Sequence, residues 1–168
     1  MSMRRYLLVL DMDLLAVDEQ FDLAPINYLV AKREQGPCEV VVLSLAGAGQ
    51  ARLSAMELLL GARSGKFPVA PRPDHDTGAA AEHRMNLAVR HLTTIGCQAS
   101  GLISDEDLVK AVRSEARVHD YDEVILATGQ QEGAWPARVA GRDPVHRLRR
   151  RLRQRLIVFP GRPRRQER

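Results

Sequence analysis

Two carboxylates stand next to the first apolar run of the chain. Tyr6 to Leu10 is a continuous apolar stretch that predicts a buried strand, and Asp11 and Asp13 follow it. Alternate residues of an extended chain point to one side, so both carboxylates can face the same group. Aspartates placed in this way can attack a phosphoester, protonate its leaving group and hold Mg²⁺. The pair therefore admits a Mg²⁺-dependent phosphatase.

The same segment resembles the first motif of haloacid-dehalogenase-type phosphatases, D-x-D-G-T. Ser44, at the end of the second apolar run, would supply the hydroxyl of that family's site. Asp105 and Asp107 would supply its acidic metal-binding residues. Leu14 and Leu15 stand in place of the Gly and Thr of the motif, and no convincing lysine follows. We expect the strand-end aspartates to be solvated or to cap local backbone, and keep the phosphatase as an alternative.

A second group of potential metal ligands is Asp74-His75-Asp76, with His83 nearby. It lies in or beside a segment rich in Pro and Gly, residues 61–78, which we expect to be one long loop. Paired cysteines or an HExxH spacing, which mark zinc sites, do not accompany it. We therefore expect solvated side chains and no metal site.

Arginines accumulate near the C-terminus. Residues 138–168 carry twelve arginines against Asp143 and Glu167, a net charge of +10; because the whole chain carries +4, residues 1–137 carry −6. A basic face can hold a polyanion through phosphate contacts that depend on salt and ignore sequence. No aromatic interleaving accompanies it, so we expect a solvated face, no nucleic-acid binding, and a basic-face binder of nucleic acid or another polyanion only as an alternative.

Length and composition fit one α/β domain in the cytoplasm. The chain has 168 residues, enough for a single core, and no apolar run approaches the ~20 residues of a membrane helix. The apolar run after Arg4 and Arg5 ends after five residues, which is short for a signal peptide. Two cysteines, Cys38 and Cys97, do not make a disulfide scaffold, and we expect reduced thiols.

Strands and helices alternate along the sequence. Short apolar runs predict five strands: Tyr6–Leu10, Glu39–Leu45, Gln98–Ile103, Tyr121–Ala127 and Arg155–Phe159. Helical spacing predicts helices from Pro25 to the Gly36-Pro37 stop and over Ala51–Leu60, Ala79–Ile95, Leu108–Ala116 and Val145–Gln154, with Ser104 to Asp107 as a capping run. This alternation predicts an open, parallel, five-stranded sheet with helices on both faces. Ligand chemistry then belongs at the carboxyl ends of the strands, where strand order reverses.

Three segments stand out within this order of elements: RRYLLVLDMD, GLISDEDLVKAVRSEARVHDYDEVILAT and GRDPVHRLRRRLRQRLIVFP. Through these segments the chain resembles the universal stress protein family over residues 4–160. The resemblance implies a Rossmann-like fold, similar to that of the adenine nucleotide alpha hydrolases, over residues 1–161, with a basic tail at 162–168. It places Asp11, beside Met12, at the adenosine part of bound ATP, together with Val42 of the second strand.

The phosphate-binding pattern of the family's ATP-binding branch, G-x2-G-x9-G-[S/T], keeps its spacing in this chain but not its residues. Thr128 and Gln131 stand at the first two glycines, and Gly141 is followed by Arg142 in place of Ser or Thr. Side chains at glycine positions block close approach of backbone N–H groups to phosphates, whereas Arg142 can act as a phosphate clamp. These four residues are our candidate phosphate contacts, and we expect weak or absent ATP binding.

The resulting hypothesis is a non-catalytic, regulatory protein of the stress response. An ATP-binding nucleotide sensor is the alternative closest to it. The resemblance also implies a homodimer through the last strand, and the apolar edge from Leu156 to Phe159 supplies a physical reason, because an unpaired edge of this kind invites pairing with a copy of itself.

Overall fold

The chain folds around one parallel sheet. The computed structural model describes residues 3–11, 24–46, 76–128 and 144–160. Five strands lie in the order β3-β2-β1-β4-β5, and every neighbouring pair is parallel. They are β1 (Arg4–Leu10), β2 (Cys38–Leu45), β3 (Gln98–Ser104), β4 (Glu123–Thr128) and β5 (Arg155–Pro160). The helices are α1 (Ala24–Glu34), α3 (Asp76–Thr94), α4 (Leu108–Val118) and α5 (Pro144–Arg151).

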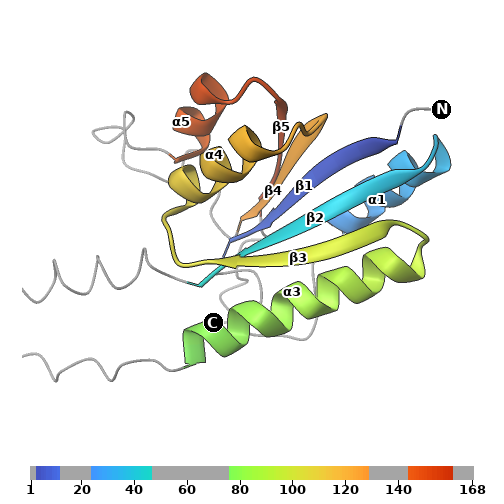
Figure 1. Cartoon of the computed structure of the whole chain (residues 1–168), viewed down its shortest axis with the longest axis horizontal. Helices are drawn as coiled ribbons and strands as arrows, with labels where there is room; N and C mark the ends of the chain where they lie inside the picture. Colours follow the sequence, from blue (N-terminus) through green and yellow to red (C-terminus); the bar gives the residue numbers. More distant parts are fainter. Residues whose placement is uncertain (1–2, 12–23, 47–75, 129–143, 161–168) are drawn as a thin grey trace, which may run out of the picture.

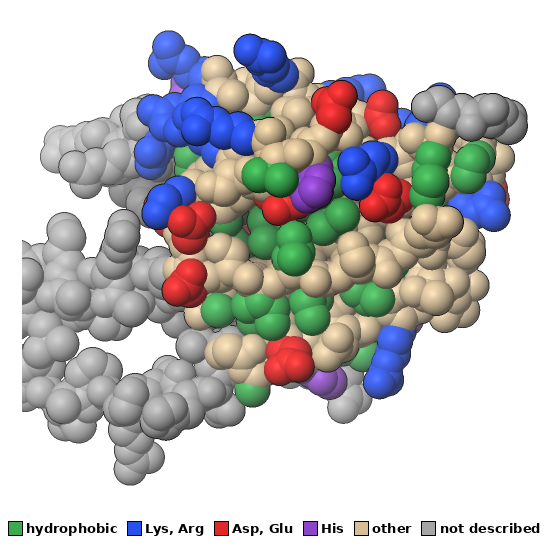
Figure 2. Space-filling model, viewed as in Figure 1, with side chains coloured by type: hydrophobic (Ala, Val, Ile, Leu, Met, Phe, Trp, Pro, Cys, Tyr) green, Lys and Arg blue, Asp and Glu red, His purple; other side chains and the backbone are tan. Residues whose placement is uncertain are grey.

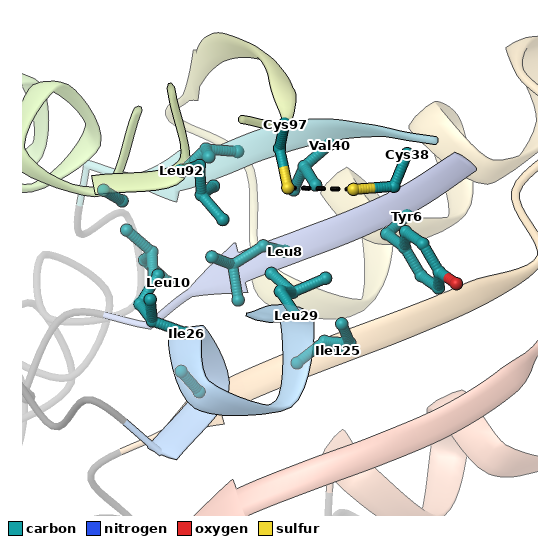
Figure 3. Packing of buried hydrophobic residues seen from close by; sticks show 13 residues of the cluster. Tyr6, Leu8, Leu10, Ile26, Leu29, Cys38, Val40, Leu92, Cys97 and Ile125 are labelled. Carbon is teal, nitrogen blue, oxygen red and sulfur yellow. Dashed lines mark hydrogen bonds between the residues drawn. The ribbon is translucent and has the colours of Figure 1, made fainter. Parts of the chain in front are cut away.

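Helices cover both faces of the sheet, as the alternation of elements predicts. Figure 1 shows α4 and α5 on one side and α1 and α3 on the other. Each face has its own hydrophobic cluster. Side chains of α1 and α3, such as Leu29 and Leu92, pack against Leu8 and Val40 (Figure 3). Val112 of α4 and Leu148 of α5 pack on the opposite face. The central strands are apolar at successive positions because both of their faces are covered.

Two helix boundaries differ from the sequence prediction by three residues. Helix α3 begins at Asp76, so the last residues of the predicted loop 61–78 belong to the helix. The alanines that follow Gly78 favour helix and allow its first turn to include Gly78. Helix α5 ends at Arg151, three residues early, because the chain needs a turn before β5.

The N-cap of α4 is Asp107, the last residue of the predicted capping run. Its carboxylate accepts a hydrogen bond from the backbone N–H of Lys110 at 3.1 Å. Ser104 still belongs to β3, and its hydroxyl accepts a hydrogen bond from the backbone N–H of Glu106 at 3.2 Å. The sequence run therefore contains two successive local caps in which each side chain satisfies a different backbone donor.

Strand order reverses between β1 and β4. Strands β2 and β3 are added in turn on one side of β1, and strands β4 and β5 are added on its other side. Helices leaving β1 and β4 diverge to opposite faces, which opens a crevice at the carboxyl ends of these two strands in folds of this kind. Of the described helices, none combines the length and apolar character needed to cross a membrane.

Candidate functional site

Asp11 and Thr128 meet where strand order reverses. Leu10 lies opposite Ala127 in the β1–β4 register, and the backbone N–H of Asp11 continues the ladder by donating to the Ala127 carbonyl at 3.0 Å. The Thr128 hydroxyl donates to Oδ2 of Asp11 at 3.1 Å. Thr128 is 3% exposed, whereas Asp11 is half-buried. The carboxylate is therefore oriented by its neighbour and still reaches the surface of the described structure.

Two polar side chains lie at the carboxyl end of the neighbouring strand β2. Ser44, opposite Leu10, is fully buried, and its hydroxyl has no hydrogen-bond partner among the described residues. Arg84 of α3 is only 5% exposed and donates through one terminal nitrogen to the Leu45 carbonyl at 3.2 Å. A buried hydroxyl without a partner and a buried guanidinium are both costly in an apolar core. These two residues therefore make the carboxyl end of β2 polar, although it is buried.

A glycine allows α3 to lie close to the sheet and bring Arg84 to this edge. A Cβ atom built on Gly101 of β3 would lie 2.6 Å from Cγ of Met85, and still closer to its sulfur. Met85 follows Arg84 directly on α3, so the side chain next to the guanidinium occupies the space that Gly101 leaves open. The reach of Arg84 to the end of β2 therefore depends on this close approach of helix and strand.

The sequence-predicted nucleotide residues divide into three groups. Asp11 and Thr128 are brought together at the reversal of strand order. Val42 lies in the middle of β2, opposite Leu8, and is fully buried in the core rather than at the strand end. The remaining four, Met12, Gln131, Gly141 and Arg142, lie outside the described residues.

Of the residues of the phosphatase alternative, Asp11 and Ser44 lie at the ends of the neighbouring strands β1 and β2, whereas the other acidic residues do not join them in the described part of the chain. Asp13 lies outside that part. Asp107 caps α4, and it and Asp105 follow β3, which is separated from β1 by β2. Two strand spacings place the ends of β1 and β3 about 10 Å apart. Among the described residues, no three His, Cys, Asp or Glu side chains are grouped to hold a metal.

The sequence group Asp74-His75-Asp76 with His83, for which no metal site is expected, lies only partly in the described chain, and Asp76 is the first residue of α3. Asp74 and His75 lie outside the described residues, and His83 is exposed on α3.

Charged groups at the opposite, amino end of the sheet pair with one another. On one face, Glu123 accepts hydrogen bonds from the Tyr28 hydroxyl at 2.7 Å and from the Lys32 ammonium at 3.2 Å. Burial, followed by the bond to Glu123, raises the pKa of Tyr28, and the bond to Tyr28 contributes most to raising the pKa of Lys32. On the other face, the Tyr121 hydroxyl donates to Glu115 at 2.6 Å, and burial raises its pKa.

These perturbed groups therefore form closed donor–acceptor sets rather than a reactive site. The geometry of the Arg5 guanidinium, bidentate on Glu39 at 2.7 and 3.2 Å, supports the same interpretation. Structural ion-pair networks shift pKa values as catalytic sites do, and these groups lie at the amino ends of the strands, away from the edge where ligands of such sheets bind.

The arginines of α5 face outward, as the sequence predicts. Val145 and Leu148 are buried, and the arginines at 147, 149, 150 and 151 are exposed. Figure 2 shows Lys and Arg side chains gathered over this helix. The same view shows hydrophobic side chains along the edge strand β3, where Leu102 and Ile103 are 41% and 45% exposed.

The fold is that of universal stress proteins. No protein-family model matches the chain, and no curated protein sequence matches it significantly. Among solved structures, the protein MJ0577 is similar with a TM-score of 0.61 and 11% identity, over 95% of this chain and 96% of that one. The universal stress protein from Archaeoglobus fulgidus in complex with dAMP has a TM-score of 0.53 and 10% identity, over 92% and 96%. A second structure of the Archaeoglobus fulgidus protein gives 0.52 and 10%, over 92% of both chains.

Proposed function

We propose that this chain is a non-catalytic regulatory domain that binds an adenine nucleotide weakly, through the adenosine end. The observation that carries the proposal is the hydrogen bond between Thr128 and Asp11 at the reversal of strand order. Ligands of open α/β sheets bind at this point, and a carboxylate fixed there can accept hydrogen bonds from ribose hydroxyls. A similar fold in complex with dAMP supports the same ligand class.

Weak binding follows from the side chain of Thr128. This residue stands where the family's ATP-binding branch has a glycine. Its side chain is buried and its hydroxyl is turned to Asp11. A glycine would leave backbone N–H groups accessible to phosphate oxygens, whereas a threonine fills that space. We therefore expect the β- and γ-phosphates to add little to the affinity.

Arg84 supports an anionic ligand. Its buried guanidinium lies at the end of β2, the strand beside β1, and contributes positive charge to the edge that also carries Asp11. A cation held in a low-dielectric environment acts on a nearby phosphate more strongly than a solvated one does. One phosphate near this charge fits a nucleoside monophosphate better than a triphosphate.

The test compares AMP with Mg-ATP by thermal unfolding and by titration calorimetry. A ligand at ten times its dissociation constant adds about 1.4 kcal/mol, or about 3–6 °C for a domain of this size. We expect AMP and Mg-ATP to give shifts within a factor of two of each other at equal concentration. ATP binding at least tenfold tighter than AMP binding would overturn the adenosine-end proposal, and no binding of either would overturn nucleotide binding.

Two variants assign the binding to the site. Asp11→Asn removes the charged acceptor and is expected to weaken AMP binding about tenfold or more, the value of a hydrogen bond to a charged group. Asp105→Asn makes the same change of charge at the end of β3, two strands away, and is expected to leave AMP binding unchanged. Equal effects of both variants on AMP affinity would mean that binding depends only on the net charge of this edge of the sheet.

Absence of catalysis has its own assay. The protein is expected to release no phosphate from ATP or from a generic aryl phosphate in the presence of Mg²⁺. Hydrolysis that Asp11→Asn abolishes would replace this proposal with the phosphatase alternative.

The proposed assembly is a homodimer through β5. This strand pairs with β4 on one side and is an edge of the sheet, and Leu156 to Phe159 are half-buried against both layers. Strand β3 is the other edge, and its exposed Leu102 and Ile103 offer a competing surface. Amide hydrogen exchange at low and high protein concentration distinguishes them. We expect protection that grows with concentration in β5, whereas protection growing in β3 instead would identify the other edge as the interface.

A further inference from the structure

Two buried cysteines face each other across adjacent strands. Cys38 is the first residue of β2, and Cys97 immediately precedes β3. Because Glu39 lies opposite Gln98 in the parallel register, the two cysteines occupy the preceding pair of opposite positions. Their side chains point toward each other in the core beside Val40 (Figure 3), and the residues are 3% and 4% exposed. Both are free thiols.

The distance between the two sulfur atoms is already close to that of a disulfide bond. Sγ of Cys38 lies 2.8 Å from Sγ of Cys97, which is shorter than the roughly 3.5–4.0 Å of ordinary nonbonded contacts. Neighbouring strands are about 4.8 Å apart, within the range of about 4.4–6.8 Å between the Cα atoms of bonded cysteines. A disulfide between them therefore needs less than about 1 Å of further approach and no rearrangement of the sheet.

We propose that Cys38 and Cys97 form an intrachain disulfide when the protein meets a peroxide. One thiolate attacks an oxygen of hydrogen peroxide, breaking the O–O bond and giving a sulfenic acid and hydroxide. The second thiol sulfur then attacks the sulfenic sulfur, forming the S–S bond and releasing water. In sum, two thiols lose two electrons and two protons, and one peroxide becomes two waters.

Burial of the two cysteines favours a small oxidant, and the raised pKa of Cys97 slows the reaction of that thiol. Burial, followed by the hydrogen bond to Cys38, raises the pKa of Cys97 to about 12, which the nearby Arg33 partly opposes. The thiolate of Cys97 is therefore scarce at neutral pH. With so little surface exposed, hydrogen peroxide can reach the sulfurs more easily than a bulky disulfide reagent.

The bond would connect distant parts of the chain without touching the nucleotide site. Cys38 and Cys97 are separated by 59 positions, so the bond closes a long loop and restricts the unfolded chain. The pair lies at the amino ends of β2 and β3, whereas Asp11 and Thr128 lie at the carboxyl ends of β1 and β4. The inference therefore stands whether or not a nucleotide binds.

The test follows the two thiols of the full chain through oxidation. The protein is treated with hydrogen peroxide, denatured, alkylated and weighed by mass spectrometry. We expect a mass about 2 Da below that of the reduced chain, with no alkyl groups added. The oxidised protein should unfold about 8–16 °C higher, and dithiothreitol should reverse the shift. Because the chain has only two cysteines, an intrachain bond can join no other pair.

Variants and a second route to oxidation keep the proposal falsifiable. Cys38→Ala and Cys97→Ala should each lose the thermal shift while the other thiol stays available to alkylation. A disulfide-linked dimer on a non-reducing gel, or sulfinic acid on single cysteines without a cross-link, would overturn the proposal. Refolding from denaturant with oxidised glutathione removes the limit of burial, and two alkylatable thiols after that treatment would also overturn it.

Discussion

Gly101 is the point at which the packing of α3 on β3 can be tested most sharply. Replacing it with alanine adds one methyl group that would lie 2.6 Å from Cγ of Met85 and closer still to its sulfur. The clashing atoms are in the middle of the Met85 side chain rather than at its end. Accommodation therefore requires a new rotamer of Met85 or a displacement of α3 away from the strand.

The expected cost follows from two opposing effects. Overpacking of a fitted contact costs about 1–3 kcal/mol. Alanine recovers about 0.5–1 kcal/mol relative to glycine because it restricts the unfolded chain. The net expectation for Gly101→Ala is a loss of about 1–2 kcal/mol in the free energy of unfolding, or about 2–8 °C in Tm for this chain length.

A double-mutant cycle in urea isolates the contact. Met85→Ala removes the clashing atoms, so Gly101→Ala should cost nothing, or stabilise slightly, when it is introduced into the Met85→Ala protein. The coupling energy between the two positions should then be at least about 1 kcal/mol. Additive effects of the two substitutions, within about 0.3 kcal/mol, would refute the explanation of Gly101 as a packing glycine. The close approach of α3 to β3 would then no longer explain the position of Arg84.

Three further predictions concern single side chains. Thr128→Val should lower the free energy of unfolding, measured in urea, by about 1–2 kcal/mol because the Asp11 carboxylate loses a hydrogen-bond donor. Thr128→Ser keeps the hydroxyl and should retain most of the wild-type stability. A valine variant as stable as the wild type would contradict this prediction. Ser44→Ala should leave the free energy of unfolding unchanged or raise it by up to about 1 kcal/mol, since its buried hydroxyl has no partner among the described residues. A loss of stability would mean that the hydroxyl is bonded. Under reducing conditions stability should fall above pH 9, because the folded state keeps the Cys97 proton up to a pKa of about 12 while the unfolded chain releases it near 9. Cys97 should contribute at most about 1.4 kcal/mol per pH unit to the slope, and a Cys97→Ala variant with the same slope would contradict the assignment.

The fold was accessible from sequence because its signals are local. Runs such as Leu7 to Leu10 and Val124 to Ala127 are apolar at successive positions, which only strands covered on both faces tolerate. The order of the strands was not accessible in this way, because it depends on which crossovers pass over which face. The start of α4 at Leu108 matches the prediction because the capping residue before it is a local signal, whereas α3 begins and α5 ends three residues away from the predicted positions.

The candidate site was only partly accessible. Asp11 and Thr128 each follow an apolar run, and the rule that ligands bind at strand ends brings them together. Arg84 was missed because a charged residue in a helix is usually solvated. Its position three residues after Ala81 and four before Ala88, both buried, was the available signal. Val42 was assigned by resemblance, and the register places it two residues too early in β2 to reach the strand end.

A titration with AMP, followed by backbone amide NMR shifts, tests the central claim most directly. We predict that the shift changes cluster at the carboxyl ends of β1, β2 and β4, at Asp11, Ala46 and Thr128, and that Asp11→Asn reduces them. Changes confined to the arginines of α5, or to the amino ends of the strands around Glu123, would contradict the assignment of the site.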